Sequence, residues 1–305
     1  MFDSSKRMFL LEQGIFSNQQ NYILTATAKA THCRDNPIKS LATQWLFAIP
    51  NFGLQQAMLP DVYRVALRYR LLMPQFNMSH DCINAGCGQY TDIMGFHVLS
   101  CRGVGGGGYE RHNNLAKQLC ALSNSIGIRA RYNAKEGHTP GVNSLNQYCD
   151  FRPGDITLLD EDLCVDVTMV SPLSNSKSHT AEGKHPGLLV EKAARNKHEK
   201  YSAAISLHDK NFLPFAVDTA GFIGVEALQL LRRFASAYAR TRDAPFSHAY
   251  SIVLRRVSFI IMHQIALQLL AYVNARRDQV ALRASTTCSS LCTYVADNNS
   301  NNKSS

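Results

Sequence analysis

The segment 149–172, CDFRPGDITLLDEDLCVDVTMVSP, carries the strongest indication of the fold. Two apolar runs, ITLL and LCVDVTMV, flank a short polar turn, which predicts two strands joined as a hairpin. Asp155 opens the first strand and Asp166 lies inside the second. An aspartate inside an apolar strand is costly unless it is paired or binds a metal. The two carboxylates could share one hard cation such as Mg²⁺; the alternative is that one or both cap a turn or pair with an arginine.

The segments on either side complete an α/β pattern. Upstream, residues 109–127 place leucines at helical spacing and end at a glycine, and residues 128–132 alternate as in a strand. Downstream, residues 187–209 are typical of a helix and residues 212–219 of a fourth strand. The predicted order across the core is therefore helix, three strands, helix, strand.

A cluster of metal-ligand residues precedes this core. Cys82, Cys87, His97 and Cys101 fall within one short segment, and zinc takes four such ligands tetrahedrally. A structural zinc can contribute about 10–16 kcal/mol to folding, enough to fold a segment of this size. The alternative is four unconnected residues, because cysteine is often buried as a small hydrophobe. We expect a zinc knuckle over residues 81–102.

A glycine-rich stretch, GVGGGGYERHN, joins the knuckle to the first core helix. Gly103, Gly105 and Gly108 match G-x-G-x-x-G, but no acid follows about twenty residues later, as a dinucleotide site requires. Tyr109 follows the last glycine, where a phosphate-binding loop would have lysine and then serine or threonine. We interpret the stretch as a hinge, whose backbone amides could still contact a DNA phosphate.

The bulk composition favours an anionic partner. The net charge is +9 and the isoelectric point about 9.1, which points to nucleic acid before membrane. Nine cysteines without an evident secretion signal favour reduced thiols, and we expect a nuclear or otherwise cytoplasmic protein. Polar residues interrupt the longest apolar run, 257–273, so we predict a buried helix and no membrane span.

The same patterns divide the chain into segments. We expect a weakly ordered start (1–41), a helical basic linker segment (42–80), the knuckle (81–102), the core (103–220), C-terminal helices (221–280) and a disordered tail (281–305).

The Cys-Cys-His-Cys knuckle, the RHN helix, the RPGD strand, the DVT strand and K-x-x-K-Y occur here in one order. That order resembles the restriction-like endonuclease of PD-(D/E)xK type found at the C-terminal end of site-specific non-LTR retrotransposon polyproteins. The resemblance covers about residues 42–275. It implies an α/β restriction-endonuclease-like core, Mg²⁺ held by Asp155 and Asp166, and an active-site lysine at Lys197 supported by Tyr201.

The sequence departs from that family at two positions. Gly154 separates the proline from the first aspartate, and Thr168 stands where the usual pattern has lysine. A cation must then come from the following helix, which offers Lys192, Lys197 and Lys200. At 100° per residue Lys197 and Tyr201 share a face, Lys200 lies about 60° from Lys197, and Lys192 lies about 140° away.

The first core helix adds two candidates, Glu110 and His112, as an auxiliary metal ligand or base. The expected function is a metal-dependent DNA endonuclease derived from a non-LTR retrotransposon, with a reverse transcriptase or an RNA–DNA complex as a further partner. The main alternative is a zinc-containing nucleic-acid-binding protein whose nuclease pocket has decayed. A weaker alternative is a membrane-anchored protein that uses residues 246–276.

Overall fold

The computed structural model describes residues 44–51, 56–103, 107–132, 154–172, 187–208 and 211–301. Side chains are described as far as Ala281, apart from some near the end of helix α5. The expected weakly ordered start, part of the glycine hinge (104–106) and the last four residues lie outside the described residues.

A four-stranded mixed sheet forms the centre of the fold. Its order is β3 (Ala130–Tyr132), β4 (Ile156–Leu158), β5 (Leu163–Val170) and β6 (Asn211–Asp218). The first three strands form an antiparallel meander, and β6 runs parallel to β5. A parallel pair needs a crossover connection, and helix α5 (Leu188–His208) supplies it.

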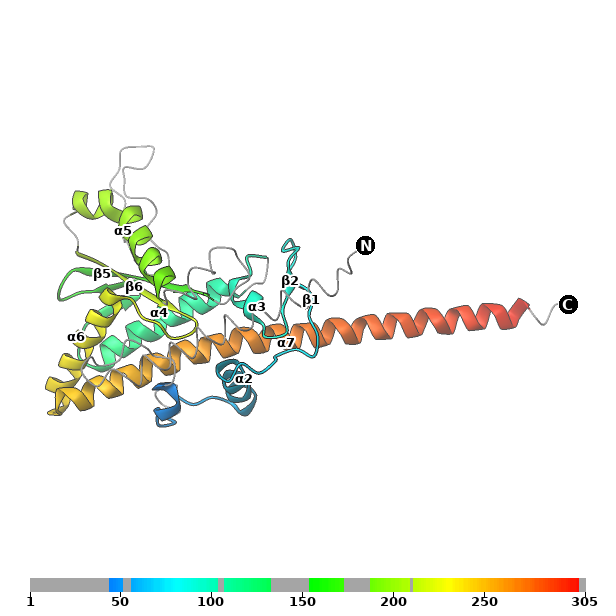
Figure 1. The fold of residues 1–305 in the computed structure, drawn as a ribbon, viewed down its shortest axis with the longest axis horizontal. Helices are drawn as coiled ribbons and strands as arrows, with labels where there is room; N and C mark the ends of the chain where they lie inside the picture. The colour runs from blue at the N-terminus through cyan, green and yellow to red at the C-terminus, as the bar shows by residue number, and fades with distance from the viewer. Residues whose placement is uncertain are drawn as a thin grey trace.

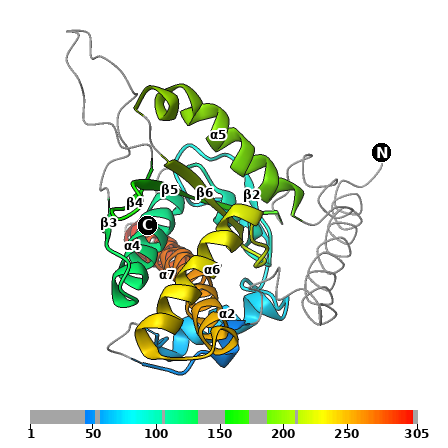
Figure 2. The ribbon, with the colours of Figure 1, turned by 90° about the vertical axis from the view of Figure 1, so that its left-hand side faces the viewer.

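Helices cover both faces of this sheet (Figure 2). Helix α5 lies over one face, and α4 (Gly108–Ser125) and α6 (Val225–Arg242) lie over the other. Val165 and Val167 of β5 are fully buried in the core. The fold is thus mixed α/β, and its element order from α4 to β6 is the predicted helix, three strands, helix, strand.

Helix α7 (Phe246–Asn301) is the longest element and projects far beyond the body of the molecule (Figure 1). The helix continues to Asn301, and the disordered tail over 281–305 stays a prediction. No stop signal interrupts the helix: Pro245 precedes it, and no glycine or proline occurs from Phe246 to Asn301.

The first part of α7 packs into the core. By length and composition alone, Phe246–Ala281 could cross a membrane, but 72% of its apolar window is buried inside the protein. Ala249, Val253, Leu254 and Ile265 have no exposed surface. This burial agrees with the predicted core helix, and the absence of a membrane span stays a prediction.

The segment before the knuckle packs on the same helix. It holds a short 3₁₀ helix, η1 (Gln44–Phe47), and α2 (Pro60–Arg70), and both contact α7. The backbone N–H of Trp45 donates to Ser258 Oγ of α7 at 2.8 Å. The helices of the segment 42–80 thus pack into the common core, and its role as a basic linker stays a prediction.

Candidate functional site

The four predicted zinc ligands come from one small substructure beside α7. Strands β1 (His80–Asp81) and β2 (Tyr90–Thr91) pair antiparallel, and the short helix α3 (Phe96–Ser100) follows. Cys82 directly follows β1, Cys87 lies in the turn between the strands, and the remaining two ligands lie in and just after α3. Short loops thus bring the pair Cys82 and Cys87 close to the pair His97 and Cys101.

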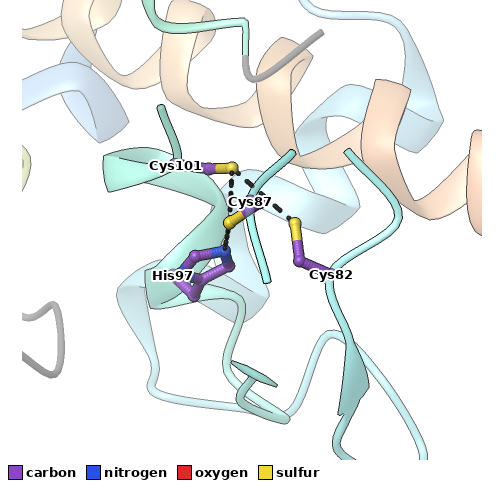
Figure 3. A group of neighbouring side chains, drawn as sticks. All are labelled: Cys82, Cys87, His97 and Cys101. Atoms are coloured by element: carbon purple, nitrogen blue, oxygen red, sulfur yellow. Dashed lines mark hydrogen bonds between the residues drawn. The ribbon is translucent and has the colours of Figure 1, made fainter. Parts of the chain in front are cut away.

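The ligand atoms converge (Figure 3). All four lie within 4.8 Å of one another. The Cys87 and Cys101 sulfurs are 3.5 Å apart, the Cys82 and Cys101 sulfurs 3.7 Å, and Cys87 Sγ lies 3.3 Å from His97 Nε2. Three sulfurs and one imidazole nitrogen in this arrangement could hold a metal, and they suit zinc.

Neighbouring residues hold two of these ligands in place. Asp92 accepts hydrogen bonds from the backbone N–H groups of Met94, Phe96 and His97 (2.9–3.1 Å), which fixes the start of α3. Asn84 Nδ2 donates to the Cys101 sulfur at 3.3 Å. The sequence reasoning missed both supports, because Asp92 lies three residues before the N-cap Gly95 and so outside the usual capping position.

The cysteines differ in how readily each becomes the thiolate that zinc requires. Burial is the largest effect on Cys101 and raises its pKa, but hydrogen bonds from Asn84 and the Gly103 N–H outweigh it, so the pKa is lowered. Burial and then the neighbouring thiols raise the pKa of Cys87 to about 11. The hydrogen bonds from Asn84 and the Gly103 N–H thus favour the thiolate form of Cys101, the form that binds zinc.

A second site lies at the sheet, where Asp155 and Asp166 meet. In the β4–β5 ladder Ile156 pairs with Val165, so one further step of the same register places Asp155 opposite Asp166. The Val167 N–H donates to Asp155 Oδ2 at 2.7 Å, which ties Asp155 to the residue next to Asp166. Both aspartates are buried, at 4% and 0% exposure. We call this group, with Lys197, Tyr201 and His112, the acidic corner.

Helix α5 supplies the partners of Asp166. Lys197 Nζ lies 2.7 Å from Asp166 Oδ2, and the Tyr201 hydroxyl donates to Asp166 Oδ1 at 3.1 Å. Lys197 and Tyr201 are four residues apart and lie on one face of the helix, as their spacing predicts. Lys200 lies further out: its ammonium donates to the Tyr201 hydroxyl at 2.8 Å and sits 4.5 Å from the ring centroid.

Helix α4 supplies the partner of Asp155. His112 Nε2 lies 3.0 Å from Asp155 Oδ1. Burial is the largest effect on His112 and lowers its pKa, but the hydrogen bond to Asp155 and the charges of Asp155 and Asp166 outweigh it, so the pKa is raised. The charge of Lys197 acts on the same imidazole and lowers its pKa.

Gly154 allows the approach of Asp155 to β5. A Cβ atom at this position would lie 2.7 Å from the Val165 carbonyl oxygen and 2.9 Å from its carbon, distances that real side chains do not adopt. Gly154, at which this sequence departs from the family pattern, therefore lets β4 and β5 approach each other at the acidic corner.

The remaining candidates lie elsewhere. Glu110 is exposed and lines a hollow of about 380 Å³ between α4 and α7, away from the side of α4 that carries His112. Lys192 is exposed on α5. Thr168 is half-buried on β5, two residues beyond Asp166. The structure thus brings Asp155, Asp166, Lys197, Tyr201 and His112 together, with Lys200 at the edge.

Comparison with known proteins gives no match, whether with family models, with curated proteins or with solved structures.

Proposed function

We propose that the protein is a metal-dependent DNA endonuclease of the restriction-like type, which hydrolyses phosphodiester bonds at the acidic corner. One observation carries the proposal: the Lys197 ammonium lies 2.7 Å from Asp166. Asp155 is held beside Asp166 by its hydrogen bond from the Val167 N–H. Two buried carboxylates and a lysine in one place are the groups that such chemistry needs. The hairpin pattern had already suggested that the two carboxylates share a cation, and the family resemblance had added Lys197 to them.

The donor set of the corner fits Mg²⁺. Asp155 and Asp166 offer only carboxylate oxygens, the ligands that this cation prefers, and they lie on neighbouring strands. A carboxylate oxygen that accepts one hydrogen bond keeps a second lone pair. These two residues would hold the ion, which when bound lowers the pKa of water and stabilises charge on a phosphate.

The protein groups around the carboxylates have separable roles. Lys197, which is 21% exposed, can place its ammonium beside a phosphate and stabilise the negative charge that develops there. Tyr201 positions Asp166 through its hydroxyl, and Lys200 in turn holds that hydroxyl. His112 positions Asp155. Lys197 would take over the task of the lysine that Thr168 replaces.

The knuckle has a structural role in this proposal. Zinc on Cys82, Cys87, His97 and Cys101 would fix the segment that packs against α7 and leads into α4. The net charge of +9 would attract the DNA backbone without choosing a sequence. An origin in a non-LTR retrotransposon, a reverse transcriptase partner and a nuclear location belong to the same proposal and rest on the resemblance.

One observation favours the decayed binding protein as a second candidate. The carboxylate oxygens of the corner already contact protein groups: His112 and the Val167 N–H at Asp155, and Tyr201 and Lys197 at Asp166. A corner neutralised by its own side chains could persist as a purely structural feature. Only a measurement of cleavage separates the two candidates.

A plasmid nicking assay tests the proposal. We expect wild-type protein to convert supercoiled plasmid to open circles in Mg²⁺ and Asp155→Ala to be inactive. Asp160→Ala is the matched control, because Asp160 is an exposed aspartate of the same hairpin that pairs with Arg129 at the surface. Wild-type protein that never nicks in Mg²⁺ or Mn²⁺, while still binding DNA, would establish the second candidate.

A further inference from the structure

An aromatic residue stands at the start of helix α4, beside the acidic corner. Tyr109 is 72% exposed in the first turn. It lies three residues before His112, so the two side chains project from neighbouring positions of the helix surface. His112 contacts Asp155, so the exposed ring borders the acidic corner.

A second aromatic residue approaches the same place from the sheet. Tyr132, half-buried at the end of β3, pairs in register with Ile156, the residue after Asp155. The Lys117 ammonium lies 5.6 Å from the centroid of the Tyr132 ring. Lys117 belongs to α4 and lies about two turns after Tyr109 on that helix. Its ammonium therefore reaches from α4 to Tyr132 on β3.

The electrostatic surroundings of Tyr132 agree with this placement. Burial is the largest effect on its hydroxyl and raises the pKa, and the charge of Asp155, then Tyr109 and then Glu110, raises it further. The register gives the geometric link, because Tyr132 lies opposite Ile156, the residue next to Asp155. Two tyrosines and a lysine border the acidic corner on the side of α4 and β3.

We propose that Tyr109, Tyr132 and Lys117 form a subsite for an unpaired nucleotide of the substrate strand, in which the base stacks on the exposed Tyr109 ring and Lys117 contacts the adjoining phosphate. This inference rests on the proposed nuclease function and names its substrate class: nucleic acid with at least one unpaired base next to the scissile bond. Single strands and single-stranded flaps belong to this class.

The chemistry of stacking explains the preference for unpaired bases. Every base has a flat π-face that can stack on an aromatic side chain, so stacking is tolerant of sequence. Within a duplex both faces of an internal base are covered by its neighbours, and the base must first be unstacked at a cost of a few kcal/mol. Lys117 is pre-positioned by its contact with the Tyr132 ring, which reduces the entropy lost when it meets a phosphate.

Binding without added Mg²⁺ tests the subsite separately from cleavage. The full chain is titrated into a fluorescently labelled single strand and into the blunt duplex of the same sequence, and anisotropy is measured. We expect Tyr109→Ala to weaken binding of the single strand roughly 5- to 150-fold, the range that corresponds to one lost stack. Tyr109→Phe, which keeps the ring, should bind like wild type.

Tyr63→Ala is the matched control, because Tyr63 is also exposed (45%) but lies on α2. It should bind both ligands like wild type, and Tyr109→Ala should bind the duplex like wild type. The subsite is refuted when Tyr109→Ala binds the single strand as tightly as wild type, or loses the same factor on both ligands. Tyr109-dependent binding by a protein that never cleaves would leave the subsite standing and overturn only the proposed activity.

Discussion

At the scale of single residues, the proposed cleavage needs another cation to replace the lysine that is missing at Thr168. Lys197 contacts Asp166, whereas Lys192 is exposed on the same helix. We predict that Lys197→Ala lowers the cleavage rate about 10²–10³-fold, because a group that stabilises transition-state charge is lost. DNA affinity should stay near the wild-type value, since this contact is weak in the ground state.

Lys192→Ala is the control and should cleave like wild type. Single-turnover cleavage and anisotropy, measured on the same preparations, separate rate from affinity. An active Lys197→Ala together with an inactive Lys192→Ala would mean that the helix presents another face to the substrate.

Gly154 gives a second prediction at this scale. An alanine there would put its Cβ atom 2.7 Å from the Val165 carbonyl oxygen, so β4 and β5 must move apart at the acidic corner. We predict that Gly154→Ala lowers the free energy of unfolding by about 1–3 kcal/mol, as overpacking does, and that it impairs cleavage.

Gly108→Ala is the matched control, because a Cβ at that position meets no atom within 4 Å among the described residues beyond its chain neighbours and its own helix backbone. Chemical denaturation of both variants measures the difference. Equal stabilities for the two variants would show that the close approach of Gly154 to β5 is not required.

At the scale of elements, the knuckle is a unit built around its ligands. We predict one zinc per chain in purified wild-type protein and a loss of that zinc in Cys101→Ser, because the Cys101 sulfur contacts both other cysteine sulfurs. Removing the metal should destabilise the knuckle, since binding energy of structural zinc is folding energy.

Cys120→Ser is the control, because Cys120 is buried in α4 and lies outside the cluster. Metal analysis and thermal unfolding of the two variants check the prediction. Stoichiometric zinc in Cys101→Ser would remove that residue from the ligand set.

The elements also show where sequence reasoning succeeds and where it stops. The hairpin was predictable because LCVDVTMV and ITLL are apolar runs with β-branched residues around a polar turn. The shared face of Lys197 and Tyr201 followed from the helical period. The need for glycine at 154 was not predictable, because it depends on Val165, which meets it only in the folded sheet. The contact of His112 with Asp155 joins residues 43 positions apart and has no local signal.

At the scale of the whole molecule, α7 is the element on which α2, α3, α4 and α6 pack. Leu254 has no exposed surface, whereas Leu267 on the same helix is 38% exposed. We predict that Leu254→Ala lowers the free energy of unfolding by about 2–5 kcal/mol and that Leu267→Ala lowers it by about 1 kcal/mol or less. Urea denaturation measures both. Similar small losses for both variants would contradict the placement of α7 in the core.

The central claim is that one corner of the molecule, formed by β4, β5, α4 and α5, cleaves DNA. The most direct measurement is the single-turnover cleavage rate of a labelled DNA as Mg²⁺ is titrated, for wild type, Asp166→Asn and Asp160→Asn. The account predicts a rate that rises to saturation with Mg²⁺ for wild type and Asp160→Asn, and no cleavage by Asp166→Asn. Cleavage by Asp166→Asn at the wild-type rate, or no cleavage by wild type at any Mg²⁺ concentration, would contradict it.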